Sequence, residues 1–146
     1  MNRLHFSIII NSQRENVWKA MLDQETYKLW TITFAEGSYY EGSWNKGEKI
    51  RFLTPEGEGM TSIIAENIPF DFISIKHLGS IKDGIEDMES PESKSWASAF
   101  ENYTFRERDG ATELRIDVDA PPEFEEYMNS AWPKALARLK EICEER

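Results

Sequence analysis

Metal-binding and catalytic motifs are almost absent from this sequence. Two histidines among 146 residues exclude a histidine-rich metal site. The acidic segments lack the glycine turn and the closing glutamate of a calcium loop. No Gly-x-Ser-x-Gly elbow and no glycine-rich phosphate loop occurs, so acyl and phosphoryl transfer lose support. We therefore expect no bound metal, no cofactor and no catalytic residue that a motif would reveal.

Positive charge is also in short supply. The chain has 17 Lys and Arg against 27 Asp and Glu, which gives a net charge of −10. Such a surface repels phosphate backbones and anionic lipid headgroups, and no local cluster of Lys and Arg offsets this repulsion. We expect no nucleic-acid partner.

Cysteine and long hydrophobic runs are rare as well. The one cysteine, Cys143, cannot form an internal disulfide and lies among apolar neighbours, so it is predicted to be a buried thiol in a reducing compartment. Residues 1–10 have neither the cleavage site of a secretory signal nor the length of a membrane span. These absences predict a cytoplasmic protein without membrane insertion.

The strongest pattern that is present is an apolar stripe near the C-terminus. Its members recur at spacings of three and four: Phe124, Tyr127, Met128, Ala131, Trp132, Ala135, Leu136, Leu139, Ile142 and Cys143. This spacing predicts one amphipathic helix. Pro133 either kinks that helix or lies in the first turn of a fresh helix capped by Ser130, and the second interpretation is favoured.

The N-terminal part predicts a strand followed by two short helices. Alternating apolar residues indicate a strand over 4–10. Ser12 and Glu15 have the spacing of a capping box, which predicts a helix over 13–22. A second helical segment begins at Asp23.

Turn residues and a period of two then predict six further strands, over residues 38–44, 48–53, 59–67, 70–78, 95–107 and 112–119. Within 95–107 the large apolar residues change parity, which predicts a β-bulge near Glu101. The expected order is β-α-α-β-β-β-β-β-β-α in a single α+β domain spanning residues 1–146. A long helix must then bury its stripe against a curved antiparallel sheet.

Several local motifs resemble those of one known group. They are residues 11–18, Leu29-Trp30, the hairpin Gly42-Ser43-Trp44-Asn45-Lys46-Gly47, residues 66–69 and residues 110–114. In this order they resemble the START-like (SRPBCC) superfamily, which has the helix-grip fold of the birch-pollen allergen. The branch that they resemble most is the C-terminal domain of the activator of the heat-shock chaperone ATPase. These residues belong to turns and scaffold rather than to a catalytic site.

The resemblance implies a seven-stranded antiparallel sheet that grips the C-terminal helix, with an internal cavity that relatives use for lipids, hormones or polyketides. Residues 79–95 would then lie near the cavity mouth, as a lid or as a solvated loop, and the loop is favoured because charged runs are usually solvated. The candidate ligand-binding residues are Trp30, Phe34, Trp44, Phe52, Ile75, His77, Trp96, Glu101, Tyr103, Met128 and Trp132. So many rings suit a flat hydrophobic ligand.

His77 and Glu101 form the one pair that could act as acid and base, since both are expected on inward faces. Strand pairing is predicted to place His77 opposite residues 96–97 and Glu101 opposite residues 72–73, several residues apart. A role in orienting a ligand is therefore favoured over catalysis.

Three functions follow as hypotheses. The first is binding of a small hydrophobic molecule, such as a lipid or polyketide, between the sheet and the C-terminal helix. The second is a protein-interaction module that contacts a chaperone or another protein through its acidic surface. The third is a cyclase- or hydrolase-like enzyme that uses His77 and Glu101.

Overall fold

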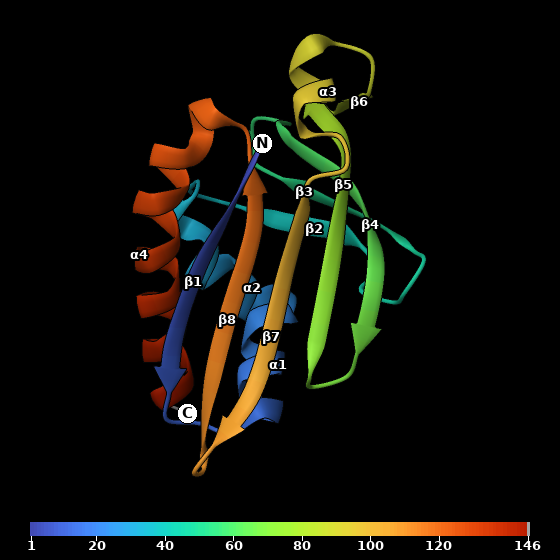
Figure 1. The fold of residues 1–146 in the computed structure, drawn as a ribbon. Helices are drawn as coiled ribbons and strands as arrows, with labels where there is room; N and C mark the ends of the chain where they lie inside the picture. The colour runs from blue at the N-terminus through green and yellow to red at the C-terminus, as the bar shows by residue number, and fades with distance from the viewer. Residues whose placement is uncertain (146) are drawn as a thin grey trace.

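In the computed structural model, which describes residues 1–145, a long C-terminal helix lies along a curved antiparallel sheet (Figure 1). The strands are β1 (Asn2–Ile10), β2 (Tyr39–Gly42), β3 (Lys49–Leu53), β4 (Gly59–Ile68), β5 (Phe72–Lys82), β6 (Ile85–Asp87), β7 (Phe100–Arg108) and β8 (Ala111–Ala120). The sheet order is β1-β8-β7-β5-β4-β3-β2, and β6 pairs only with β5. The predicted α+β helix-grip fold is confirmed, with β6 as an additional short strand.

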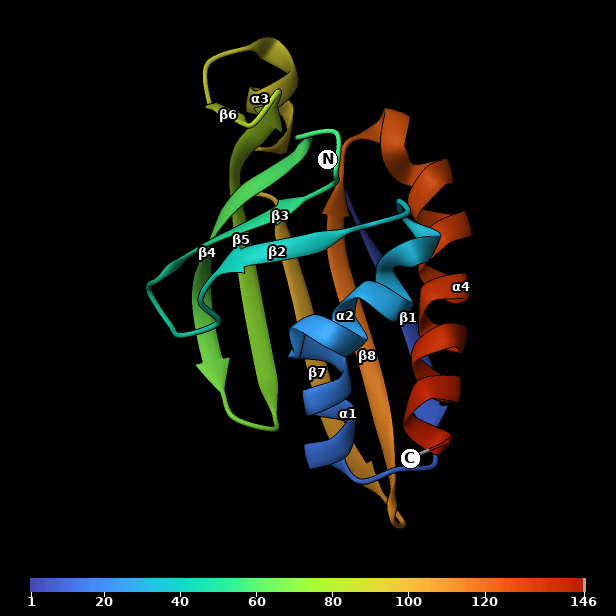
Figure 2. The same cartoon turned by 180° about the vertical axis from the view of Figure 1, so that it is seen from behind.

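The helices are α1 (Arg14–Leu22), α2 (Gln24–Trp30), α3 (Pro91–Trp96) and α4 (Glu125–Glu144), with 3₁₀ turns η1 (Thr31–Thr33) and η2 (Pro122–Phe124). Figure 2 shows α1, α2 and α4 on the same side of the sheet. None of the helices within residues 1–145 is both long enough and apolar enough to cross a bilayer.

The core lies between the sheet and the C-terminal half of α4. Leu114 and Ile116 of β8 are fully buried on the inner face of the sheet. Leu136 and Leu139 of α4 are buried against that face. Cys143 lies on the same apolar stripe of α4 and is buried, as predicted. The apolar residues that recur every second position in the strands therefore pack against those that recur every three or four positions in α4, in one core cluster.

Two predictions about helix ends are wrong. Ser12 does not cap α1, because the N-cap position is Gln13 and the Ser12 hydroxyl instead accepts a hydrogen bond of 2.5 Å from the Asn16 side chain. No fresh helix begins at Ser130, since α4 is continuous through Pro133. Pro133 lies on the exposed face of α4, so its ring is directed away from the packed stripe and the helix keeps its register on both sides.

The predicted bulge in β7 is also wrong. β7 pairs with β8 in an unbroken register from Glu101 opposite Val118 to Arg108 opposite Ala111. The register shifts of the sheet lie in β4 instead, between Thr61 and Ser62 and again before Glu66. Trp96 belongs to a helix, where strand parity has no meaning, and Phe100 is only half-buried at the first position of β7.

Residues 79–95 do not form the predicted solvated loop. β5 extends to Lys82, β6 folds back along it, and α3 follows (Figure 1). Ser90 caps α3 by accepting a hydrogen bond of 3.2 Å from the Ser93 backbone N–H. Hydrogen bonds from the Ser90 hydroxyl and from the backbone N–H groups of Glu89 and Ser90 lower the pKa of Asp87 to about 2. The segment is thus ordered by its own polar groups.

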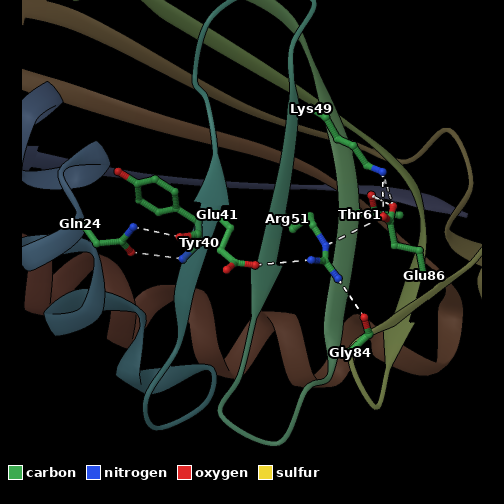
Figure 3. Close-up of polar contacts among 8 residues, drawn as sticks. All are labelled: Gln24, Tyr40, Glu41, Lys49, Arg51, Thr61, Gly84 and Glu86. Atoms are coloured by element: carbon green, nitrogen blue, oxygen red, sulfur yellow. Dashed lines mark hydrogen bonds and ion pairs between the residues drawn. The ribbon is translucent and has the colours of Figure 1, made fainter.

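Polar contacts on the outer face of the sheet connect β6 and the turn before it to side chains of β3 and β4 (Figure 3). The Arg51 guanidinium donates to the Gly84 carbonyl at 3.1 Å. The Glu86 carboxylate pairs with Lys49 at 2.5 Å and accepts a hydrogen bond of 2.5 Å from the Thr61 hydroxyl. These contacts hold the connection that leads into α3.

The outer edge of β2 is protected by a side chain. The Gln24 amide donates to the Tyr40 carbonyl at 2.9 Å and accepts from the Tyr40 backbone N–H at 3.2 Å (Figure 3). One glutamine therefore occupies the donor and the acceptor that a further strand would use. Unpaired edges invite association between chains, so this contact limits it.

We expect Gln24→Ala to lower the free energy of unfolding by about 1–2 kcal/mol, because two hydrogen bonds are lost. The exposed edge should also produce concentration-dependent association in analytical ultracentrifugation. Gln13→Ala is the matched control, since Gln13 is exposed and makes no side-chain cap bond. Equal behaviour of the two variants in urea unfolding and sedimentation would contradict the edge role of Gln24.

Candidate functional site

A cavity of about 420 Å³ lies between the concave face of the sheet and the elements α2, η1 and α4. Its walls include nine of the predicted residues: Trp30, Phe34, Phe52, His77, Trp96, Glu101, Tyr103, Met128 and Trp132. Its exposed lining residues, which mark the opening, are Glu58, Lys82, Glu92 and Tyr127. The structure therefore brings most of the predicted site residues around one volume.

Trp132 of α4 is the centre of the aromatic wall. Its ring centroid lies 4.9 Å from that of Phe34, 5.9 Å from Trp30 and 6.1 Å from Tyr103. The Trp30 indole donates a hydrogen bond of 3.1 Å to the Met21 carbonyl, which fixes the orientation of its ring. Rings held in this way give the cavity a rigid apolar surface.

Two of the predicted residues do not line the cavity. Ile75 is fully buried within the core, and Trp44 packs its ring 5.2 Å from Tyr40 and 5.8 Å from Phe52. Ile75 does point inward from β5, but parity does not tell whether an inward side chain borders a cavity or is covered by its neighbours. Trp44 lies beyond the end of β2, where strand parity does not apply.

Other lining residues were missed from the candidate set. Tyr27 lines the cavity from α2 and lies one turn before Trp30, a spacing that could have indicated it. Phe124 lines it from η2 and contacts Trp96 at 5.0 Å between ring centroids. Phe124 was the first member of the C-terminal apolar stripe, so the same stripe contained the signal.

His77 and Glu101 are in contact, contrary to the predicted pairing. Glu101 lies opposite Ile75, and the His77 backbone N–H donates to the Ala99 carbonyl at 2.9 Å. The two side chains are thus diagonal neighbours, with His77 Nε2 3.2 Å from Glu101 Oε1. The predicted register failed because residues 91–96 form a helix, so the strand begins only at Phe100.

The contact is part of a chain of four polar side chains. Ser62 Oγ lies 2.7 Å from His77 Nδ1, and the Tyr103 hydroxyl donates to Glu101 Oε2. An ionised carboxylate only accepts, so His77 must carry its proton on Nε2 to bond Glu101. A neutral His77 can then accept from the Ser62 hydroxyl at Nδ1, and every bond in the chain has a donor and an acceptor.

The order of this chain argues against a serine nucleophile. Ser62 is fully buried behind His77 and is not a wall residue, whereas Glu101 faces the cavity and its side chain is 23% exposed. A nucleophile must reach the reacting atom. His77, Glu101 and Tyr103 all line the cavity, and the Glu101 carboxylate is the most exposed of them.

Electrostatics at the cavity wall is dominated by negative charge. Burial, followed by the charge of Glu101, raises the pKa of both Tyr103 and Tyr27, so the two phenols stay protonated. Within residues 1–145 no group of three or more His, Cys, Asp or Glu side chains is placed to hold a metal ion.

Solved structures with similar folds include the Aha1 dimer from Colwellia psychrerythraea, at 20% identity and a TM-score of 0.76, covering 99% of this chain and 97% of that one. DynU16, from the dynemicin biosynthetic locus, is 14% identical with a TM-score of 0.72, and the match covers 99% of this chain and 48% of that one. CalU16 from Micromonospora echinospora is 13% identical with a TM-score of 0.68, covering 97% and 75%.

At these identities the likeness shows the fold alone. No curated protein sequence matches this chain significantly. The family model described as activator of Hsp90 ATPase homolog 1-like protein matches residues 11–144. The chain therefore belongs to the family of activator of Hsp90 ATPase homolog 1-like proteins.

Proposed function

We propose that this protein binds a small hydrophobic molecule, of lipid or polyketide size, in the cavity between the sheet and α4. The observation that carries the proposal is a cavity of about 420 Å³ with aromatic walls and a few polar groups, among them Glu101 bonded to His77 and Tyr103. Small-molecule sites typically have volumes of roughly 300–1,000 Å³, apolar walls and a few placed polar groups. The rigid rings reduce the entropy lost on binding, which favours affinity.

The fluorescent neutral probe N-phenyl-1-naphthylamine tests the proposal. We expect saturable binding, with quenching of tryptophan emission and amide shifts confined to residues around the cavity. In Ala35→Trp an indole replaces a half-buried wall residue, so the affinity should fall about tenfold or more, a loss of about 1.4 kcal/mol or more. Ala137→Trp adds the same ring on the exposed face of α4 and should leave the affinity unchanged.

Amide spectra of the variants also distinguish a blocked cavity from an unfolded protein. An amide spectrum with native dispersion for Ala35→Trp shows that weaker binding does not come from unfolding. Absence of probe binding to the wild-type protein, or equal loss in both variants, contradicts the proposal.

Membership of the family supplies a second candidate, activation of the ATPase of an Hsp90-type chaperone. It is supported by the match over residues 11–144 and by the acidic surface, with a net charge of −10. Salt-sensitive binding to a purified chaperone together with faster ATP hydrolysis would support it, and unchanged hydrolysis at saturating protein would contradict it. The cyclase- or hydrolase-like alternative at His77 and Glu101 stays a prediction.

A further inference from the structure

The charged groups of the cavity wall are strongly unbalanced. Four carboxylates line it, and Lys82 is its single lysine or arginine. That lysine is held by Glu92 at 2.6 Å, and Asp119 is held by Arg3 at 2.9 Å. Glu101 has no Lys or Arg within ion-pair distance anywhere in residues 1–145.

The bonds that Glu101 does make leave room for a ligand. Its two oxygens accept one hydrogen bond each, from His77 Nε2 and from the Tyr103 hydroxyl. An ionised carboxylate offers about four acceptor positions. The remaining acceptor positions belong to a side chain that is still 23% exposed at the cavity wall.

Filling the cavity has a consequence for this carboxylate. An apolar molecule displaces the water that solvates Glu101, and an ionised group without a compensating partner is costly to desolvate. A carboxylate ligand adds repulsion from the four wall carboxylates. A ligand that donates to Glu101, best with a positive charge, offsets the loss of water while the carboxylate stays ionised.

The rings around His77, the residue bonded to Glu101, suit the same chemistry. The ring centroids of Phe52 and Trp96 lie 6.3 Å and 6.4 Å from that of His77, and both residues line the cavity with Glu101. Aromatic faces attract ammonium groups, and the attraction is larger where water is excluded. The apolar body of the ligand would lie against Trp132 and Trp30, which line the same cavity.

We infer that the ligand of this cavity is a hydrophobic amine, with its ammonium group bound to Glu101 between aromatic rings and its apolar body against α4. This inference rests on the proposed ligand-binding function and specifies its chemical class. His77 and Tyr103 hold the carboxylate, and Ser62 holds His77 from behind.

Four probes with one ring system test the inference by calorimetric titration. They are 2-naphthylmethylamine, 2-naphthylmethanol, 2-methylnaphthalene and 2-naphthoate, which present a cation, a neutral donor, no polar group and an anion. We expect the amine to bind about tenfold or more tighter than the alcohol, and the naphthoate to bind weakest.

Two variants test whether the preference for the amine depends on the charge of Glu101. Glu101→Gln keeps the shape of the side chain and removes its charge, so the amine and the alcohol should then bind within about twofold of each other. Glu107→Gln is the matched control, because Glu107 is an exposed carboxylate of the same strand that does not line the cavity, and it should preserve the preference. The ranking of the four probes by the wild-type protein is independent of how well either variant folds.

The outcomes separate the inference from the proposed function. Binding of none of the probes overturns both. Binding of the probes without an advantage for the amine, or with naphthoate as the tightest ligand, overturns the amine inference and leaves the cavity as a hydrophobic site. Loss of the preference in Glu107→Gln but not in Glu101→Gln also overturns it.

Discussion

Replacing Trp132 by alanine should lower the free energy of unfolding by about 3–5 kcal/mol, as truncation of a buried tryptophan usually does. Trp132 is 2% exposed and packs against rings from three other elements, Phe6 of β1, Trp30 of α2 and Tyr103 of β7. Truncation would leave these rings without their common neighbour and enlarge the cavity toward β1. Urea unfolding followed by far-UV circular dichroism measures the loss.

Met128→Ala is the matched control on the preceding turn of the same helix. Met128 also lines the cavity but is only half-buried, so its truncation should cost about 1 kcal/mol. Trp132→Phe should recover part of the stability, because a ring remains. If Trp132→Ala and Met128→Ala lose the same amount, Trp132 is not the residue that joins α4 to the sheet at the cavity.

The overall fold was predictable because its signals are local. The alternation along β8 and the stripe of α4 each need only about ten to twenty residues of sequence, and each identifies a buried face without reference to the other. Since a one-sided helix and one-sided strands must share a core, the helix-grip arrangement follows from these patterns together with the resemblance.

Strand register was less predictable because it depends on what the connections contain. The contact between His77 and Glu101 is set by how many residues the chain uses between β5 and β7. An acidic, polar segment with few apolar residues gave no sign that β6 and α3 would form there. The sequence therefore predicts correctly that His77 and Glu101 lie on the inward face, but the predicted pairing between their strands is wrong.

The cavity divides α4 into two parts with different surroundings. Met128 and Trp132 in its first half line the cavity, whereas Leu136, Leu139 and Cys143 in its second half lie in the packed core. No periodicity in the sequence marks this division, since the apolar stripe runs through both halves. It depends on how far the sheet and α2 approach the helix, which only the assembled structure specifies.

Pro133 lies at the junction of these halves, and we expect Pro133→Ala to raise the free energy of unfolding by about 2 kcal/mol. A proline in a helix interior costs about 3 kcal/mol relative to alanine, because it lacks the N–H that would bond the carbonyl four residues earlier. Alanine gains conformational entropy in the unfolded chain, which offsets about 0.4–1 kcal/mol of that difference. Pro133 is exposed, so no packing is lost.

Urea unfolding gives the stability change, and hydrogen exchange of the amides in residues 125–132 shows whether the first half of α4 becomes more protected. Lys134→Ala is the control for an exposed substitution beside Pro133, and it should change the stability by less than about 0.5 kcal/mol. A loss of stability in Pro133→Ala would show that the proline shapes α4 at the boundary between cavity and core. The wall residues Met128 and Trp132 would then depend on that shape, and the affinity for N-phenyl-1-naphthylamine should fall with the stability.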